Sequence, residues 1–349
     1  MKVFNYKVLK EMKWDNEIVN YLSLIHEYRA KEKVLKTQKV KELDKLVEIA
    51  KIQSTESSNE IEGIRTTNTR LKQLVTEKTT PKNRDEEEIS GYRDVLNIIH
   101  DNYEYISITP NYILQLHKTL YSHSSKSIGG SFKNVQNYIS GVDCNGKSYT
   151  LFTPLAPYET PKAIEDICDE FNKALASNEV DPLILIPIFI HDFLCIHPFL
   201  DGNGRMSRLL TTLLLYKCGY YIGRYISLES KISKTKDAYY YALDLSQQGW
   251  YENIGNPEAF IKYILGTIIS AYRDLEDRID IVNDKLSSMD IVRNAISNVI
   301  GKFNKSNLVE LCPTLGVKSI ELALKKLVDD GMLEKLGNGK NTYYVRKNM

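Results

Sequence analysis

Twelve consecutive residues, from His197 to Arg208, hold more side chains capable of chemistry than any other stretch of the chain. The segment reads HPFLDGNGRMSR and lies between two apolar stretches that predict helices. His197 has a side chain whose ordinary pKa suits a general base near neutral pH. Asp201 supplies a carboxylate that can hold Mg²⁺ against phosphates. The segment therefore combines one base with one candidate metal ligand.

The second half of this segment predicts a phosphate site. Gly202 and Gly204 allow a ligand to approach the backbone closely, and Asn203 is a good helix N-cap. A helix N-terminus favours anions through its free N–H groups and its dipole. Arg205 and Arg208 lie on the first turn of that helix and are expected to share a face. Their guanidiniums would bind a polyphosphate, so the spacing indicates transfer of a phosphate-containing group to an acceptor.

Each of these features alone is commonly structural. A histidine before proline often ends a helix, DGNG is a common turn, and paired arginines often make surface ion pairs. Their occurrence together within twelve residues favours the functional interpretation.

Most of the chain predicts helix. Four places combine a capping residue with proline at the first helical position, which is a specific start signal. The helices that begin there are expected to end near Leu120, Ala176, Ile196 and Ile281. The cap pairs are Thr109-Pro110, Thr160-Pro161, Asp181-Pro182 and Asn256-Pro257.

Three further stretches complete the predicted frame of the first 280 residues. Residues 17–50 predict one or two amphipathic helices and residues 83–103 another. Residues 127–155 are rich in glycine and predict a hairpin, with strands over Val135–Ile139 and Tyr149–Thr153. The most apolar stretch, residues 183–196, is shorter than the ~20 residues of a membrane span and predicts a buried core helix.

The last sixty residues predict a separate winged helix-turn-helix unit. Residues 290–349 carry ten Lys and Arg against six Asp and Glu, which is mildly basic. DNA contact is one interpretation, and protein docking or dimerisation is the other. The expected elements are helices over Ile291–Phe303, Ser306–Leu311 and Val317–Asp329, then strands over Met332–Leu336 and Thr342–Val345.

Composition narrows the class of protein. The 349 residues have a formal net charge of +1, which argues against a chain that mainly coats nucleic acid or anionic membrane. The N-terminus has no secretory signal, so a cytoplasmic location without membrane contact is expected. The five cysteines show no metal-binding spacing and predict free thiols. They are Cys144, Cys168, Cys195, Cys218 and Cys312.

The HPFLDGNGRMSR segment resembles the signature of Fic-domain proteins, HPFx[DE]GNGRxxR, at every defined position. The resemblance covers roughly residues 50–280. It implies a mainly α fold with a β-hairpin flap, followed here by the small winged helix-turn-helix unit. It implies transfer of AMP from ATP to a Tyr, Thr or Ser hydroxyl of a protein, with release of pyrophosphate. The expected units are 1–105, 106–282 and 290–349.

The resemblance also implies roles for the signature residues. His197 would be the general base, Asp201 would hold Mg²⁺, and Phe199 would anchor the loop in the core. Doc-type relatives that phosphorylate carry Lys at the position of Gly204, so the small residue favours AMP transfer. The phosphates of ATP would contact Gly202, Asn203, Gly204, Arg205 and, at the γ-phosphate, Arg208.

A second motif, Ser57 to Gly63, resembles the family's inhibitory-helix motif [ST]xxxE[GN] through Ser58 and Glu62. The resemblance implies that Glu62 pairs with Arg208 and competes with the γ-phosphate. The chain would then be a class II, self-inhibited member with its inhibitory helix over about 41–63. The alternative is an ordinary Ser/Glu capping pair on a surface helix.

Two weaker matches concern the target and the base of the nucleotide. The segment from Gly130 to Ile139 occupies the family's flap position, where the target would align by strand addition. Its predicted flap residues are Lys133, Asn134, Val135 and Gln136, although it departs from the commoner GxYR form. Tyr239 and Tyr240 resemble the family's adenine-side tyrosines, with buried core tyrosines as the alternative.

Three functions from different classes fit these residues. The first is an adenylyltransferase that uses Mg²⁺ and ATP, with self-modification and a possible homodimer. The second is a winged-helix regulator that uses the Fic domain as a nucleotide sensor, against which the intact His197 argues. The third is a de-AMPylating enzyme, which the sequence does not separate from the first.

Overall fold

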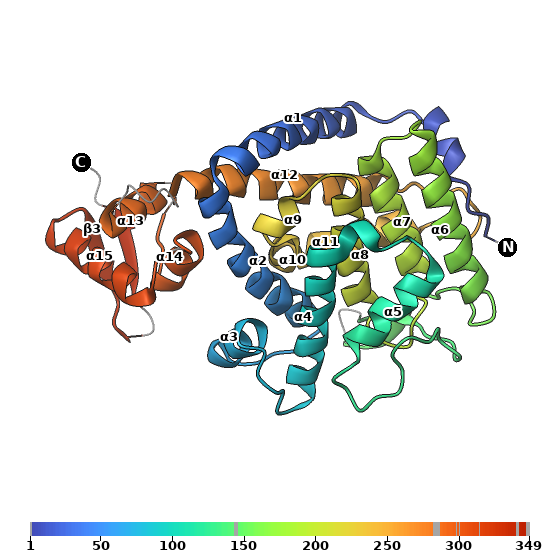
Figure 1. Ribbon diagram of the computed structural model, residues 1–349, viewed down its shortest axis with the longest axis horizontal. Coiled ribbons are helices and arrows are strands. Elements are labelled where there is room, and N and C mark those ends of the chain that lie inside the picture. The colour runs from blue at the N-terminus through green and yellow to red at the C-terminus, as the bar shows by residue number, and fades with distance from the viewer. Residues whose placement is uncertain are drawn as a thin grey trace.

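The computed structural model is mainly helical, with two short antiparallel hairpins (Figure 1). It describes residues 2–142, 146–281, 287–297, 299, 301–313, 315–339 and 342–346. The predicted mainly α fold class is confirmed. Cys144 lies outside the described residues, and Cys168, Cys195, Cys218 and Cys312 are free.

The helical body begins with a 3₁₀ turn over Tyr6–Glu11 and ends with the helix that finishes at Ile281. A second 3₁₀ turn covers Tyr103–Tyr105. The helices of the first half are α1 Asn16–Gln38, α2 Val40–Ile61, α3 Asn68–Thr76, α4 Arg84–Asn102 and α5 Pro110–Leu120. Those of the second half are α6 Thr160–Ser177, α7 Pro182–Ile196, α8 Asn203–Lys217, α9 Ile222–Tyr225, α10 Leu228–Lys234, α11 Lys236–Gln247 and α12 Glu258–Ile281.

Helix α7 is the centre of this body. Its apolar residues leave no polar face, and every residue from 183 to 196 is buried. Neighbouring helices α6, α8, α11 and α12 pack around it. Asp181 caps the helix by accepting a hydrogen bond from the Leu183 amide at 2.8 Å, and Pro182 occupies the first turn, where it removes no helical hydrogen bond. The end of α7 is therefore held at a fixed place in the core.

Two of the four predicted helix starts are confirmed, whereas α12 begins at Glu258, one residue after the predicted Pro257. Helices α5 and α7 begin at the predicted proline and end at Leu120 and Ile196, and α12 ends at Ile281. Helix α6 differs because it already begins at Thr160, which is therefore not its cap. None of the described helices is long and apolar enough to span a membrane.

Helix α2 carries the Ser58 motif at its C-terminal end. It packs against α4, α9 and α10 and ends at Ile61, so that Glu62 is its C-cap residue. The Lys236 ammonium of α11 donates to the Ile61 carbonyl at 2.7 Å. This contact fixes the end of α2 beside α11, and Glu62 follows directly.

The predicted hairpin forms, but its first strand is shorter than expected. Strand β1, Ile139–Val142, pairs with β2, Ser148–Phe152. The predicted strand began at Val135, whereas residues 135–138 lie outside the sheet. The reason is that this segment forms hydrogen bonds to the loop between α7 and α8. This loop covers residues 197–202, and we call it the HPF loop.

The C-terminal segment has its own apolar cluster, built from α13 Ser288–Ser297, α14 Lys305–Leu311 and α15 Val317–Asp329. Strands β3, Leu333–Leu336, and β4, Tyr343–Arg346, form a hairpin beside them. The predicted helix up to Phe303 was too long, because Phe303 instead forms a β-bridge with Tyr344. The order of elements agrees with the sequence analysis, while the winged-helix assignment and the limits of the units stay predictions.

Removal of residues 287–349 should leave the helical body folded, because the two apolar clusters share no residue. The ion pair Lys234–Glu310 joins the two parts at 3.0 Å and is exposed on both sides, and exposed pairs contribute ~0–1 kcal/mol. The thermal midpoint should fall by less than about 4 °C, measured by circular dichroism. A broad, non-cooperative transition would mean that the tail belongs to the main core.

Candidate active site

The HPF loop joins α7 to α8 through two residues in the left-handed backbone region. His197 ends α7 with φ 51°, and Gly202 precedes α8 with φ 86°. The sequence analysis assigned the N-cap to Asn203, and this is wrong, because Asn203 is the first helical residue. Its amide instead accepts from the Phe199 N–H at 2.9 Å and donates to the Phe199 carbonyl at 2.7 Å. Asn203 therefore fixes the curve of the loop.

Phe199 anchors this loop in the core, as predicted. Its ring is fully buried and stacks on the imidazole of His117 with ring centroids 3.6 Å apart. A ring nitrogen of His117 lies 3.1 Å from the Asp201 carbonyl. His117 thus holds the loop at two points, by stacking on Phe199 and by contacting the carbonyl of Asp201.

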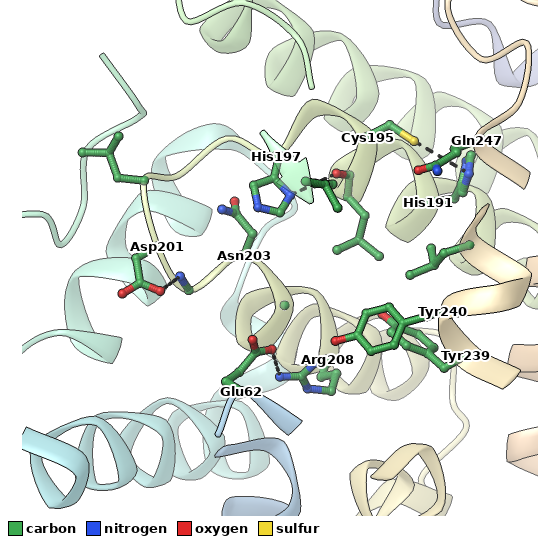
Figure 2. Close-up of a pocket in the computed structure, with 16 residues that line it drawn as sticks. Glu62, His191, Cys195, His197, Asp201, Asn203, Arg208, Tyr239, Tyr240 and Gln247 are labelled. Carbon is green, nitrogen blue, oxygen red and sulfur yellow. Dashed lines mark hydrogen bonds and ion pairs between the residues drawn. The ribbon is translucent and has the colours of Figure 1, made fainter. Parts of the chain in front are cut away.

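A cavity of about 230 Å³ opens above the loop. Figure 2 shows His197 and Asn203 on one side of it, Glu62 and Arg208 on another, and the rings of Tyr239 and Tyr240 on a third. Segments distant in the sequence, from α2, α7, α8 and α11, therefore meet at one place. The predicted residues that line it are Glu62, His197, Asp201, Gly202, Asn203, Gly204, Arg208, Tyr239 and Tyr240.

The imidazole of His197 is held in one tautomer. Its Nδ1 lies 3.3 Å from the Leu194 carbonyl, and a carbonyl only accepts, so Nδ1 carries the proton. The lone pair is then on Nε2, as a general base requires. Burial, assisted by the nearby charge of Lys133, lowers the pKa of His197 to about 4, although the Leu194 carbonyl and Glu62 oppose the shift. His197 is therefore neutral at physiological pH.

Arg208 is buried, and the hydrogen bonds of its side chain to the described residues go to Ser58 and Glu62 at the end of α2. Its Nε donates to Ser58 Oγ at 2.8 Å and its Nη2 donates to the Ser58 carbonyl at 3.0 Å. The same Nη2 forms an ion pair with Glu62 Oε1 at 2.7 Å. Only 3% of the Arg208 side chain is exposed, against 34% for Glu62. The two residues of the predicted inhibitory motif thus meet Arg208 together.

Gly204 provides the space in which the Glu62 carboxylate lies. A Cβ atom at position 204 would collide with Glu62 Oε1 and would lie 3.3 Å from Arg208 Nη1. A side chain at this position would therefore displace the Glu62 carboxylate from the place that it has in this structure.

Arg205 differs from its prediction. It was expected to share a face with Arg208, but it is 1% exposed and does not line the cavity. Its Nη2 pairs with Glu88 at 2.8 Å and donates to the Tyr121 hydroxyl at 2.9 Å. The buried carboxylate of Glu88 requires counter-charge, which Arg205 supplies together with Arg84 at 3.0 Å and Lys126 at 3.8 Å. Its Nε and Nη1 have no hydrogen-bond partner among the described residues.

Asp201 was predicted to hold Mg²⁺, and its surroundings fit a carboxylate that shares the ion with phosphates. Its Oδ1 accepts from the Gly202 amide at 2.7 Å and its Oδ2 pairs with Lys126 at 3.1 Å. Although burial opposes the effect, Lys126 and Arg205 lower the pKa of Asp201. Among the described residues no three His, Cys, Asp or Glu side chains gather to hold a metal. Mg²⁺ commonly binds one or two carboxylates and takes further ligands from phosphates and water.

The two tyrosines and the flap residues divide between core and surface. Tyr239 is 4% exposed and Tyr240 is 44% exposed, yet both line the cavity. Lys133 is buried, and Gln136 donates to the Pro154 carbonyl at 2.9 Å. The remaining two predicted flap residues, Asn134 and Val135, are exposed.

Sequence reasoning missed the groups that surround the signature. Glu88, Tyr121 and Lys126 hold Arg205 and Asp201, but they are distant in the sequence and form no motif. The cavity wall opposite Asp201 also went unpredicted. It contains His191, Leu194, Cys195, Leu243 and Gln247.

The titration of His197 should have a midpoint near pH 4, measured by NMR of the imidazole Cε1–H and assigned with a His197→Asn variant. Because the folded-state pKa lies below the unfolded value of ~6.5, the unfolded chain binds more protons between these values. This group should therefore lower folding stability as pH falls from about 6.5 to 4. A midpoint at or above 6.5 would contradict the assigned environment.

Comparison with known proteins finds one family that resembles the part of the chain with this loop. Residues 107–215 match the Fic/DOC family. The protein adenylyltransferase fic-1 of Caenorhabditis elegans is 26% identical over 161 residues, which are 46% of this chain and 27% of that protein. The protein adenylyltransferase Fic of Drosophila grimshawi is 30% identical over 115 residues, 33% of this chain and 22% of that protein. The chain thus aligns with about a quarter of the length of these relatives.

A solved structure supports the fold over nearly the whole chain. A Fic family protein from Desulfovibrio desulfuricans superposes with a TM-score of 0.62 at 20% identity, covering 97% of this chain and 98% of that one. The matched residues 107–215 contain the HPF loop, α7 and most of α8. Residues 107–215 are thus similar to the Fic/DOC family, and the Desulfovibrio structure shows a similar fold.

Proposed function

We propose that this protein is an adenylyltransferase that transfers AMP from ATP to a hydroxyl side chain of a protein, and that Glu62 inhibits it. The observation that carries the proposal is the Glu62–Arg208 ion pair inside the cavity that also holds His197. The names of the C. elegans and Drosophila relatives support the same activity.

His197 would act as the base. Its Nε2 lone pair takes the proton of the Tyr, Thr or Ser hydroxyl while the hydroxyl oxygen attacks the α-phosphorus of ATP. The bond from the α-phosphorus to the bridging oxygen breaks, and pyrophosphate leaves with that electron pair. The neutral, Nδ1-protonated imidazole described above is the form that can accept this proton. A positioned base of this kind contributes ~10²–10⁴-fold to rate.

The N-terminus of α8 would bind the phosphates. Free N–H groups and the dipole at the start of this helix favour anions, and Gly202, Asn203 and Gly204 line the cavity there. Asp201 would hold Mg²⁺, which when bound neutralises charge on the phosphates. Arg205 would act from behind the loop, since it touches Asp201 Oδ1 at 3.7 Å rather than the cavity.

Glu62 would inhibit by replacing the γ-phosphate. The buried Arg208 guanidinium is the cation in this part of the cavity that a terminal phosphate would pair with. A carboxylate at 2.7 Å already fills that role, and a second anion at the same place would be repelled. ATP would then bind without its γ-phosphate in the productive position.

The other functions use the same residues. A de-AMPylating enzyme would employ Glu62 to orient water, and a nucleotide sensor would need neither Glu62 release nor His197.

Contact of residues 290–349 with DNA and formation of a homodimer stay predictions from the sequence. Glu321 of α15 pairs with Lys305 of α14 at 2.7 Å, and this ion pair offsets part of the positive charge of the C-terminal segment.

Purified Glu62→Gly protein incubated with Mg²⁺ and ATP should become labelled from the α-phosphate and not from the γ-phosphate. Gly204 leaves room for the productive AMP pose once Glu62 is removed. The measurement is self-labelling with ATP carrying the isotope at either position. Label from the γ-phosphate alone would mean phosphorylation, and no label with intact ATP binding would favour the sensor or the de-AMPylating enzyme.

Glu62→Gly should raise the labelling rate about tenfold or more, since a charge-assisted hydrogen bond of ~1.5–3 kcal/mol no longer opposes the γ-phosphate. The matched control is Glu60→Gly, because Glu60 lies on the same helical turn but pairs with Arg65 at 3.1 Å. Equal rates for the two variants and the wild type, in a steady-state labelling assay, would remove the inhibitory role of Glu62.

A further inference from the structure

The segment that precedes β1 does not behave as a strand, because it is bonded to the HPF loop instead. Two of its residues, Lys133 and Asn137, donate hydrogen bonds to four consecutive carbonyls, from the last residue of α7 into the loop. The bonds are Lys133 Nζ to Ile196 O at 2.9 Å, Asn137 Nδ2 to His197 O at 3.4 Å, Lys133 N to Pro198 O at 2.8 Å and Asn137 Nδ2 to Phe199 O at 2.9 Å. We call Lys133 and Asn137 the strap.

The strap is closed by a contact between its two members. The Lys133 ammonium donates to Asn137 Oδ1 at 3.0 Å. Lys133 is 3% exposed, and burial lowers its pKa to about 8, so it remains mostly charged at pH 7. Among the described residues no carboxylate pairs with it. A buried ammonium is costly, and the C-terminal carbonyl of α7 provides the partial negative charge that offsets it.

The strap binds the backbone next to a residue with an unusual conformation. His197 has φ 51°, a left-handed conformation that is costly for a residue with a side chain. Such a conformation persists only when its surroundings hold it. Strap bonds reach the carbonyls on both sides of this residue, and Asn203 holds Phe199 from the opposite side.

We propose that Lys133 and Asn137 are positioning residues that hold the backbone of residues 196–199, so that His197 presents its Nε2 to the cavity in a reactive orientation. The inference rests on the proposed function, since that function makes His197 the base. Neither strap residue lines the cavity, so they act through His197 and not on the nucleotide.

The strap also contributes charge. Burial is the main cause of the low pKa of His197, the Lys133 charge lowers it further, and Glu62 raises it. Loss of the Lys133 charge should therefore raise the pKa of His197. The other titratable and charged groups that face the same cavity are Asp201, Arg208, His191, Cys195, Tyr239 and Tyr240.

This role differs from the flap role predicted for Lys133 from the sequence. A flap residue contacts the target, so its loss would change the affinity for the target. A strap residue holds the base, so its loss would lower the rate with any acceptor, self-labelling included. The two interpretations therefore predict different kinetic parameters.

The test compares Lys133→Met, Lys133→Arg and Asn137→Leu in the Glu62→Gly background. The Met and Leu variants should lose about 10- to 100-fold in self-labelling rate at saturating ATP, as expected for a displaced catalytic group. The dissociation constant for ATP, measured by isothermal titration calorimetry, should change less than twofold. Lys133→Arg keeps the charge and the donors and should recover at least tenfold of the loss.

The matched control is Lys162→Met, which removes a lysine that is 69% exposed and paired only within α6. It should change neither rate nor ATP affinity. Asn137 is only half-buried, so Asn137→Leu is expected to fold even where Lys133→Met does not. A labelling rate equal to that of the Glu62→Gly parent in both strap variants, or a parallel loss of ATP affinity, would overturn the proposal, as would failure of Lys133→Arg to recover activity.

A second readout needs no turnover. The NMR midpoint of His197 should move to higher pH in Lys133→Met and should stay unchanged in Lys162→Met. An unchanged midpoint in Lys133→Met would contradict the electrostatic part of the proposal. If the Glu62→Gly parent labels nothing, the proposed function fails, while the strap is still judged by this titration.

Discussion

A buried guanidinium needs an anion, and the arrangement of this protein follows from that requirement at Arg208. The side chain lies in the first turns of α8, and only 3% of it is exposed. Removal of one partner from a buried ion pair is strongly destabilising because the other charge is left uncompensated. Glu62 supplies the anion in this structure, and in the proposed function a terminal phosphate would replace it.

That requirement explains the position of α2. The helix packs on α4, α9 and α10, and its last carbonyl is held by Lys236 of α11. Ser58 adds two hydrogen bonds to the same guanidinium. The Glu62 carboxylate therefore reaches Arg208 from a helix that its neighbours hold in place. The Glu62 side chain is 34% exposed, so solvent and ligands have access to it.

The loop that carries the base is fixed independently of this ion pair. Phe199 and His117 stack beneath it, Asn203 bridges its curve, and the strap satisfies its carbonyls. The charged groups behind it, Glu88 with Arg205 and Lys126 with Asp201, hold the acidic end. The proposed phosphate binding and inhibition thus use one wall of the cavity, and the proposed proton transfer uses another.

Sequence reasoning succeeded where the physical cause is local. Proline after a capping residue predicted α5 and α7, and the density of functional residues from His197 to Arg208 predicted the loop of the site. Reasoning from the sequence failed where a distant partner decides. Arg205 turns away from the cavity because Glu88 is buried beside it, and residues 135–138 leave the sheet because the strap bonds to the HPF loop. No spacing rule reports such partners.

The central claim is that Glu62 and the γ-phosphate compete for Arg208, and nucleotide affinities test it most directly. The dissociation constants of ATP and AMP with the wild type and Glu62→Gly can be measured by isothermal titration calorimetry. The account predicts that loss of Glu62 tightens ATP by about tenfold and leaves AMP nearly unchanged, because only ATP has a γ-phosphate. An equal gain for both nucleotides, or none for ATP, would contradict it.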